Sequence, residues 1–354
     1  MARKVNIYDT KTLRDRIEKE NFERINLSFY RYANILDPQT LRDSMFAELS
    51  KINVLGRIYL AREGINAQIS IPDFQMENFK AILESISYFE NMYLNIAVES
   101  KKEAFLKLIV KVRNKIVADG LEDDSFDVTN VGTHLNAEEF NRKLEDSNTI
   151  CIDMRNRYES EVGHFEKAIL PDAETFRDEL PEVLEILENH KDKQILLYCT
   201  GGIRCEKASA FIKHHGYNNV FQLRGGIISY AQEIKQKNLT SKFHGKNFVF
   251  DERLGEKITD EVLGHCHICN ASCDTHTNCK NLGCHVLMLI CDSCNSELNG
   301  CCSTDCRDIL QLPEELQKDF RRKAKKSSSL VPFTKSRLKK RNYPTLNTNN
   351  IDKN

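Results

Sequence analysis

One cysteine stands where a strand is expected to meet a helix. The run Gln194–Tyr198 is apolar and predicts a buried strand, and Glu206–His215 has the pattern of a helix. Between them lies the segment Cys199-Thr-Gly-Gly-Ile-Arg-Cys205. A thiol in this position lies under converging backbone N–H groups and the positive end of a helix dipole, which stabilise its thiolate. The pattern therefore predicts that Cys199 is a nucleophile.

The residues after Cys199 favour this interpretation. Gly201 and Gly202 would let the backbone curl around the sulfur because they carry no Cβ, and Arg204 would add a cation at the rim of the site. The alternative is an unreactive, buried Cys199, but two glycines and an arginine would then serve no purpose. Cys205 could resolve an oxidised Cys199 or pack into the helix instead. The predicted active-site loop consists of Thr200, Gly201, Gly202, Ile203 and Arg204.

Most of the other cysteines are crowded together. Ten of the thirteen lie between residues 266 and 306, which indicates metal binding rather than disulfides in a chain without an export signal. The pairs Cys266/Cys269 and Cys291/Cys294 have the spacing of zinc knuckles. Because tetrahedral zinc takes four ligands, ten cysteines would supply two sites with two to spare. The candidate ligands are Cys266, Cys269, Cys273, Cys279, Cys284, Cys291, Cys294, Cys301, Cys302 and Cys306.

The pairing of these ligands stays open. One possibility joins Cys266 and Cys269 to a later pair, while Cys291 and Cys294 anchor a second site. An iron–sulfur cluster and a reduced, metal-free cluster are the rivals of zinc. Structural zinc is favoured because two short knuckles are commoner in zinc modules. The sequence contains no flavin or nucleotide-binding signature.

The elements around Cys199 alternate between strand and helix. The strand-like runs are 148–154, 194–198 and 220–223, and the helical runs are 137–144, 181–189 and 206–215. This alternation predicts a parallel sheet covered by helices, with the active site at the carboxyl ends of the strands. Cys151 lies inside one of these strands and is expected in the core.

The N-terminal residues have a different order of elements. A strand at 25–32, a helix from Asp37, a hairpin at 57–71, a helix at 76–86 and a strand at 93–98 are expected. This order is that of a ferredoxin-like domain, which hosts many functions. Arg62 and Asn66 could contact a substrate, although a hairpin turn needs polar residues in any case.

Composition and charge limit the class of protein to which this chain can belong. The chain has 354 residues, 40% of them hydrophobic and 29% charged, as in soluble proteins with more than one domain. Residues 1–9 turn polar before a signal-peptide core could form, and the apolar stretches are too short to cross a bilayer. A cytoplasmic protein is therefore expected.

The net charge of −1 conceals a basic C-terminal end. Residues 321–341 carry ten Lys or Arg and no acidic residue. They begin within the basic end of a short acidic-to-basic helix expected at 313–326, and they could contact phosphates, although such runs are more often only solvated. The other basic candidates for phosphate contact are Lys242, Lys246, Arg253 and Lys257.

The region of alternating strands and helices around Cys199 resembles a rhodanese domain. Asp153-Met-Arg155, the following Gly163-His164 and the later Gly225-Gly226 are similar to rhodanese motifs. Rhodaneses hold a persulfide on the loop cysteine, whereas related phosphatases have five residues between Cys and Arg. Four residues separate Cys199 from Arg204 here, so phosphatase activity is disfavoured. Asp153 and Arg155 are expected to brace the loop.

The chain as a whole resembles the bacterial tRNA uridine(34) hydroxylases. The similarity covers about residues 20–310, including Ala61-Arg-Glu-Gly-Ile-Asn66, the string from Cys199 to Glu206 and the cysteine-rich module. It implies an oxygen-dependent oxidoreductase of the monooxygenase class that converts the wobble uridine of tRNA to 5-hydroxyuridine. It also implies that Cys199 is the essential cysteine and that tRNA and a reductant or sulfur donor are the partners.

Three functions follow from these patterns. In the hydroxylase, the thiolate or persulfide of Cys199 would add to C6 of uracil and make C5 electron-rich. A sulfurtransferase would instead pass persulfide sulfur to an acceptor. A non-enzymatic RNA-binding protein would keep a vestigial rhodanese domain, and an ordinary thiol pKa at Cys199 would argue for it.

The expected architecture is a multidomain protein of α/β and α+β class. A ferredoxin-like domain is expected over residues 1–125 and a rhodanese-like catalytic domain over 126–244. A cysteine-rich metal-binding module over 245–312 and a basic, largely disordered tail over 313–354 would follow.

Overall fold

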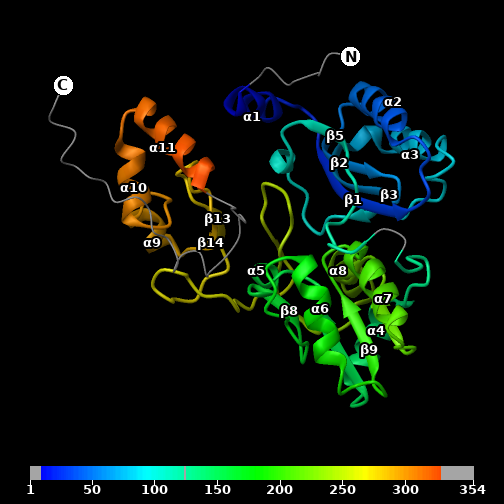
Figure 1. Ribbon diagram of the computed structural model, residues 1–354. Helices are drawn as coiled ribbons and strands as arrows, with labels where there is room; N and C mark the ends of the chain where they lie inside the picture. Colours follow the sequence, from blue (N-terminus) through cyan, green and yellow to red (C-terminus); the bar gives the residue numbers. More distant parts are fainter. Residues whose placement is uncertain (1–8, 123–124, 328–354) are drawn as a thin grey trace. The chain divides into compact units, whose positions relative to one another are not determined.

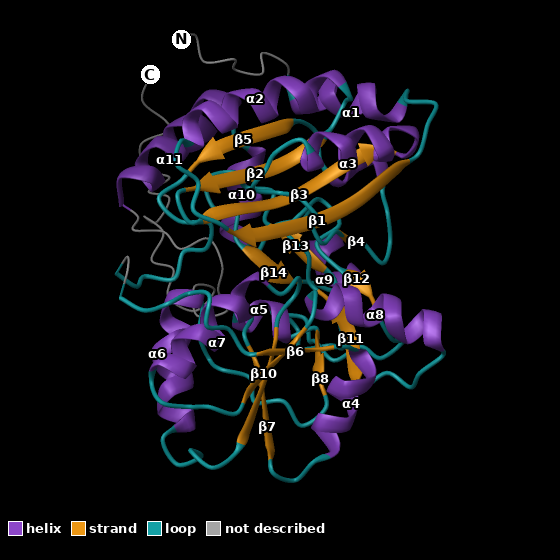
Figure 2. Cartoon of the chain, turned by 90° about the vertical axis from the view of Figure 1, so that its right-hand side faces the viewer, coloured by secondary structure: helices purple, strands orange, loops and turns teal. Residues whose placement is uncertain are grey.

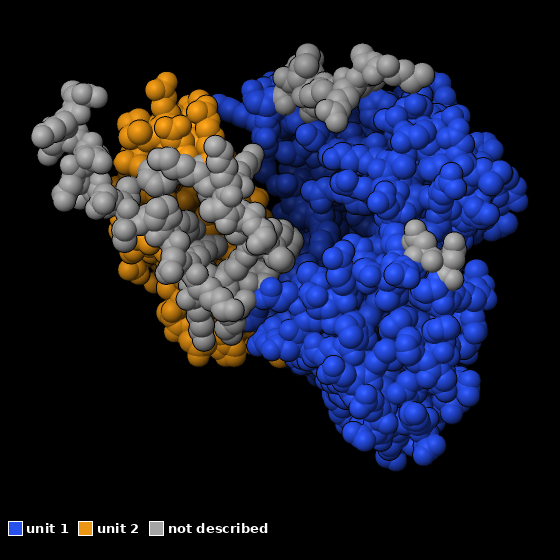
Figure 3. Space-filling view, in the orientation of Figure 1, with its two compact units in different colours: residues 1–261 blue, residues 262–354 orange. Residues whose placement is uncertain are grey.

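The computed structural model describes residues 9–122 and 125–327 (Figure 1). The chain divides into two compact units, residues 1–261 and residues 262–354 (Figure 3). Among the described residues, no helix is both long enough and apolar enough to cross a membrane.

The N-terminal part of the first unit is a five-stranded sheet in the order β4-β1-β3-β2-β5. Its neighbours are antiparallel except for the parallel pair β2 and β5. The strands are β1 (Arg24–Tyr32), β2 (Leu55–Ala61), β3 (Gly64–Pro72), β4 (Asn95–Ile96) and β5 (Leu108–Val112). The helices are α1 (Thr10–Glu18), α2 (Pro38–Lys51) and α3 (Met76–Glu84), with the 3-10 turns η1 (Asp73–Gln75) and η2 (Lys102–Ala104). The ferredoxin-like prediction is confirmed.

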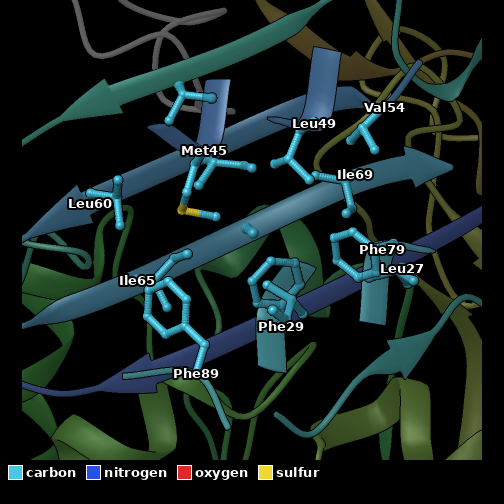
Figure 4. Packing of buried hydrophobic residues seen from close by; sticks show 14 of the residues in the cluster. Leu27, Phe29, Met45, Leu49, Val54, Leu60, Ile65, Ile69, Phe79 and Phe89 are labelled. Carbon is cyan, nitrogen blue, oxygen red and sulfur yellow. The ribbon is translucent and has the colours of Figure 1, made fainter. Parts of the chain in front are cut away.

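Helices α2 and α3 cover one face of this sheet (Figure 2). Strand β1 alternates, so that Leu27 and Phe29 point into the core formed with these helices (Figure 4). Met45 and Leu49 of α2 are at most 1% exposed. Burial of each such side chain contributes about 1.5–3 kcal/mol relative to exposure. The opposite face of the sheet is therefore left for other contacts.

The predicted strand at 93–98 is shorter in the structure. Strand β4 has two residues because it pairs with β1 only at Leu27–Ile96 and Ser28–Asn95, at the edge of the sheet. Strand β5 and helix α1 were not predicted. The apolar run of β5 pairs parallel to β2 far along the chain, which a local pattern does not reveal.

The rest of the first unit contains a four-stranded parallel sheet in the order β6-β10-β9-β7. Its strands are β6 (Thr133–Leu135), β7 (Thr149–Asp153), β9 (Gln194–Tyr198) and β10 (Val220–Leu223). The helices are α4 (Ala137–Glu145), α5 (Arg157–Ser160), α6 (Phe176–Leu187), α7 (Ile203–His214) and α8 (Gly226–Lys237). A smaller sheet joins β8 (Gly163–Phe165), β11 (Phe243–Asn247) and β12 (Glu256–Lys257).

Both faces of the parallel sheet are covered. Ile195 and Leu197 of β9 belong to the apolar cluster of α6 and α7. The alternate residues Leu196 and Tyr198 belong to the cluster that contains Phe140 of α4. The predicted parallel sheet covered by helices is thus confirmed.

Two helices begin earlier than their patterns indicate. Helix α6 begins at Phe176 rather than at residue 181, because the Thr175 side chain caps it and Pro181 fits inside the helix. Helix α7 begins at Ile203 rather than at 206, with left-handed Gly202 as its N-cap residue. The shift brings Arg204 and Cys205 into the first turn of α7.

The second unit is small and rich in cysteine. Its elements are β13 (His276–Asn278), β14 (Leu287–Leu289), α9 (Asp292–Glu297), α10 (Thr304–Gln311) and α11 (Glu314–Ser327). Val286, Met288 and Ile290 are buried among its cysteines. Helix α11 occupies the segment where a helix was expected, whereas the rest of the predicted tail, including Lys339, Lys340 and Arg341, lies outside the described residues.

Candidate functional site

Cys199 lies directly after strand β9 and is fully buried. The backbone N–H of Gly202 donates a hydrogen bond to its Sγ at 3.1 Å. The two carbonyls that begin the loop accept from α8: Ile227 N–H donates to Cys199 O at 3.0 Å, and Ile228 N–H donates to Thr200 O at 3.2 Å. The loop is therefore held from both sides, with the sulfur facing backbone donors.

The surroundings favour the thiolate form of Cys199. Burial raises its pKa, but a hydrogen bond from the Cys205 thiol, the Arg204 charge and backbone N–H groups outweigh it and lower the pKa to about 6. The pKa of Cys205 is raised well above its ordinary value, chiefly by burial and then by its hydrogen bond to Cys199. Cys199 is thus the thiolate and Cys205 is the thiol that donates to it.

Arg204 is buried, whereas the sequence suggested a cation at the rim of the site. Its side chain is 10% exposed and forms two hydrogen bonds to Glu159, at 2.6 and 2.8 Å. Thr200 Oγ1 also donates to Glu159, at 3.2 Å. Burial opposes the charge of Arg204, but Glu159 raises its pKa well above the ordinary value. Glu159, in the short helix α5, is a residue of this site that the sequence analysis missed.

Only one of the two loop glycines is required by the backbone. Gly202 has φ +100°, and a Cβ there would lie 2.5 Å from the Tyr30 hydroxyl oxygen. Gly201 has no such torsion, and a Cβ there would meet Ser28 Oγ at an ordinary 3.6 Å. Gly226 allows the start of helix α8 to approach the Cys199 loop closely, since a Cβ added at this position would lie 2.4 Å from Cys199 O.

Asp153 and Arg155 form a buried ion pair next to the loop. Arg155 donates to both carboxylate oxygens of Asp153, at 2.8 and 2.7 Å, and to Gly163 O at 2.6 Å. Burial opposes the Arg155 charge, but Asp153 raises the pKa of the guanidinium. These bonds tie the end of β7 to β8 and enclose the segment that carries Glu159. Their contact with the Cys199 loop is therefore indirect.

The N-terminal sheet forms the opposite wall of the site. A cavity of about 440 Å³ lies between this wall and the Cys199 loop. From the sheet its lining includes the polar residues Ser28, Tyr30, Arg57, Tyr59, Asn66 and Gln68, together with the apolar Leu27, Phe29 and Ile69. From the rest of the unit it is lined by Cys199, Gly201, Ile203, Arg204, Phe176 and Phe250, among others.

Hydrogen bonds tie this sheet to the loop. Asn95 donates to Gly201 O at 3.1 Å and accepts from Ser229 Oγ at 2.7 Å. Lys207 of α7 lies 2.8 Å from Glu63 in the hairpin turn and 3.1 Å from Asp119. The sheet therefore fixes the loop as well as enclosing it.

Sequence reasoning found only part of this wall. Asn66 lines the cavity, as considered possible, while Arg62 is exposed and does not line it. Tyr30, Gln68 and Asn95 were missed. A usable signal existed in β1, where Ser28 and Tyr30 form a polar face opposite the apolar one, although only the fold shows that this face is covered.

The cysteines of the second unit form two groups of four. One group contains Cys266, Cys269, Cys291 and Cys294, and the other contains Cys279, Cys284, Cys302 and Cys306. Within each group, the sulfur atoms all lie within 4.8 Å of one another. The idea that Cys291 and Cys294 anchor a separate site from Cys266 and Cys269 is therefore wrong, because the two knuckles converge.

The geometry fits a single tetrahedral ion in each group. Thiolates at about 2.3 Å from one zinc ion would lie about 3.8 Å apart. The measured Sγ–Sγ distances are 3.6 Å for Cys269–Cys291, 3.6 Å for Cys284–Cys302 and 3.7 Å for Cys302–Cys306. Each group could therefore hold one metal ion.

Two of the ten candidate ligands are corrected by this grouping. Among the described residues, Cys273 and Cys301 belong to neither group of four. Cys273 Sγ accepts a hydrogen bond from Thr275 N–H at 3.4 Å, and Cys301 is fully buried in the apolar cluster of the unit. They are the two cysteines that remain when eight of the ten candidates are assigned to the two groups of four.

The basic residues upstream of the cysteines are engaged with carboxylates. Lys242 lies 3.0 Å from Glu166, and Lys257 lies 2.7 Å from Asp260. Arg253 is bound by Asp251 and Glu256 and is almost fully buried. These pairs favour local charge pairing over phosphate contact for the three residues.

Fold and site together define a rhodanese-domain protein with additional domains on both sides. The family described as Rhodanese-like domain matches residues 136–233, the family described as UPF0176 acylphosphatase like domain matches 24–116, and the one described as Rhodanase C-terminal matches 244–307. Among solved structures, a rhodanese-related protein from Thermoplasma volcanium is 27% identical, with a TM-score of 0.25, over 28% of this chain and 92% of that one.

Curated relatives identify the family. A tRNA uridine(34) hydroxylase of Leptospira interrogans is 56% identical over 94% of this chain and 90% of its own length. The one from Photorhabdus laumondii is 48% identical over 94% of both chains, and the one from Salmonella arizonae is 50% identical over 92% and 93%. The chain belongs to the tRNA uridine(34) hydroxylase family.

Proposed function

We propose that this protein hydroxylates C5 of the uridine at position 34 of tRNA, with molecular oxygen as co-substrate and Cys199 as the nucleophile. The observation that carries the proposal is a cysteine with a pKa of about 6 in the wall of a cavity of about 440 Å³. The names of the close relatives, tRNA uridine(34) hydroxylase, supply the substrate. The cytoplasm, where thiols stay reduced, is the compartment that this proposal implies.

The cavity has the composition that a single base requires. Enzymes that modify a base take it out of its stack into a pocket that combines aromatic surfaces with hydrogen-bonding groups. Phe176 and Phe250 provide apolar ring surface, while Asn66 and Gln68 provide amides that can pair with the polar edge of uracil. The flipped uridine 34 would thus lie between the N-terminal sheet and the Cys199 loop.

The thiolate, or a persulfide formed on it, would begin the reaction. Its sulfur adds to C6 of uracil, and the electron pair of the C5–C6 double bond moves toward C5 and O4. The carbon C5 then bonds to one oxygen atom derived from O2. The other oxygen atom leaves as water, with two electrons from a reductant and two protons. Loss of the C5 proton and release of the sulfur restore the ring and regenerate Cys199.

The metal ions would be structural zinc, one held by each group of four cysteines. Four thiolates and no open position are the donor set of structural rather than catalytic zinc. Sulfur atoms within 4.8 Å of one another leave room for a single ion and not for a cluster of several irons. Bound zinc would stabilise the fold of a unit whose apolar core is too small to fold by itself.

Mass spectrometry of nucleosides tests the proposed function. Unmodified tRNA is incubated in air with the protein and dithiothreitol, beside the Cys199→Ala variant. A gain of one oxygen on uridine 34 that requires Cys199 is the expected result. A wild-type reaction in which uridine 34 gains no oxygen would refute the proposal.

A sulfurtransferase is the second candidate function, favoured by the same thiolate beneath the N–H group of Gly202. Such an environment would also stabilise a persulfide. The two functions separate in the same experiment, because thiolation exchanges oxygen for sulfur in the base. A purely RNA-binding role would need an ordinary Cys199 thiol, and the lowered pKa argues against it.

A further inference from the structure

A continuous chain of hydrogen bonds runs from the cavity to the protein surface. The hydroxyl of Tyr30, a residue that lines the cavity, donates to Glu206 Oε1 at 3.1 Å. The same carboxylate oxygen lies 2.8 Å from His134 Nε2. The exposed fraction of the side chain is 14% for Glu206 and 32% for His134. The chain therefore begins at the wall of the site and ends in solvent.

The fold brings these residues together from four elements. His134 in β6 and Gln222 in β10 are directly paired across the parallel sheet, and Glu206 lies in the first turn of α7. Tyr30 reaches them from β1 of the other sheet. The left-handed Gly202 leaves the space that the Tyr30 hydroxyl fills, since a Cβ there would lie 2.5 Å from it. The loop that carries Cys199 is thus shaped around this hydroxyl.

The network can hold a proton in either of two places. The amide nitrogen of Gln222 lies 3.1 Å from Glu206 Oε2 and 2.8 Å from His134 Nε2. A histidine nitrogen offers either one proton or one lone pair. When Gln222 donates to Oε2 of Glu206, the single lone pair of a neutral His134 Nε2 is free to accept a proton from Oε1. Once Nε2 carries the proton it donates back to Oε1, so a proton can move between these two atoms while the bond from Gln222 to Glu206 is kept.

We infer that Tyr30, Glu206 and His134 conduct to solvent the proton that C5 loses during hydroxylation. The inference rests on the proposed function. Once C5 carries the new oxygen and C6 carries the Cys199 sulfur, the C5–H bond breaks and its electron pair forms the C5–C6 double bond. The C6–S bond breaks and its pair returns to Cys199. This step is redox-neutral, because oxygen and the reductant have already reacted.

The proton moves by exchange along the chain. The Tyr30 oxygen takes the C5 proton as its own proton passes to Glu206, which passes a proton to His134 and then to solvent. Burial, the Glu206 charge and the Cys199 charge together raise the pKa of Tyr30 well above its ordinary value. A tyrosine that never ionises but relays one proton for another agrees with that environment.

The test compares variants of the relay with a matched control. Tyr30→Phe and Glu206→Gln remove proton transfer with little change of shape, while Tyr32→Phe removes the next hydroxyl on the same face of β1. The Tyr32 hydroxyl is buried and has no hydrogen-bond partner among the described residues. The rate of oxygen gain at uridine 34 is measured with unmodified tRNA in air and dithiothreitol.

Both relay variants are expected to lower kcat about 10²-fold or more with little change in KM, while Tyr32→Phe keeps the wild-type rate. His134→Ala is expected to lose activity that added imidazole restores, because the deleted side chain borders solvent. Each variant is also alkylated at Cys199 with iodoacetamide, which reports whether the loop is intact.

The outcomes separate the relay from a structural role. Wild-type kcat in Tyr30→Phe would overturn the relay alone. A fall in hydroxylation matched by an equal fall in Cys199 alkylation would assign these residues to loop structure and also overturn it. A wild-type protein that adds no oxygen would overturn the proposed function and the relay with it.

Discussion

The Cys205 thiol is expected to set the reactivity of Cys199. It is the largest of the contributions that lower the Cys199 pKa, against the opposing effect of burial. A hydrogen bond to a charged group contributes about 1.5–3 kcal/mol, and one pKa unit corresponds to about 1.4 kcal/mol. Cys205→Ala should therefore raise the Cys199 pKa by about one to two units, from about 6 to about 7–8.

The assay is the alkylation rate of Cys199 by iodoacetamide as a function of pH. Mass spectrometry of the peptide that contains Cys199 separates it from the other twelve cysteines of the chain. At pH 6 the thiolate fraction would fall about 5- to 50-fold in Cys205→Ala, since only the thiolate reacts. At pH 10 the two proteins should react at similar rates.

Cys205→Ser is the control that distinguishes the two roles considered for Cys205. Serine keeps a donor at this position but cannot form a disulfide. The Cys199 pKa should therefore stay near the wild-type value of about 6, and turnover under oxygen should be retained. Loss of turnover in Cys205→Ser with an unchanged pKa would instead support a resolving disulfide. An unchanged pKa in Cys205→Ala would refute the reasoning.

Three further predictions follow from packing and ligand geometry. Glu159→Ala leaves the buried guanidinium of Arg204 without its carboxylate and should lower the free energy of unfolding by about 3–5 kcal/mol, measured with urea. Gly202→Ala and Gly216→Ala both place a Cβ at positive φ, which costs about 1–2 kcal/mol. Only the Cβ at residue 202 also meets a side chain, at 2.5 Å. The free energy of unfolding should therefore fall further in Gly202→Ala than in Gly216→Ala. Cys291→Ser should reduce the zinc content, measured by elemental mass spectrometry, from two ions per chain to one.

Matched variants check each of these. Glu77→Ala breaks an exposed ion pair and should change the unfolding free energy by less than about 1 kcal/mol, so an equal effect at Glu159 would contradict the buried-pair argument. Equal losses at the two glycines would show that contact with Tyr30 costs nothing. Cys273→Ser should retain both ions. A brown protein whose visible absorbance bleaches on reduction would exclude zinc as the metal.

Much of the fold was predictable because its signals are local. The strand of β9, the glycines after it and the helix of α7 form one continuous segment, so the sequence predicts Cys199 at a strand end beneath a helix N-terminus. The start of α7 was less predictable. The helix begins at Ile203, directly after the left-handed N-cap residue Gly202, and not at Glu206, where the helical pattern begins. Strand β5 was missed because its partner β2 lies far away in the chain.

The candidate metal ligands likewise combine a local signal, which the sequence shows, with a long-range pairing, which it does not. Spacing alone identified two knuckles and a surplus of two cysteines. It could not show that the two knuckles face one another, because a Cys-x-x-Cys pair has the same local geometry with any partner. The pairing of Cys266 and Cys269 with Cys291 and Cys294 is decided by the hairpin of β13 and β14 and by helix α9 between and beside them.

The sequence by itself predicted Cys199 as the nucleophile, the order of the domains and two four-cysteine sites, because each prediction depends on residues that are neighbours along the chain. Only the tertiary structure decided what surrounds Cys199. The carboxylate that neutralises Arg204 comes from α5, and the cavity wall opposite Cys199 comes from β1 and β3, more than a hundred residues earlier. Such contacts depend on how the sheets pack, and no spacing within one segment encodes them.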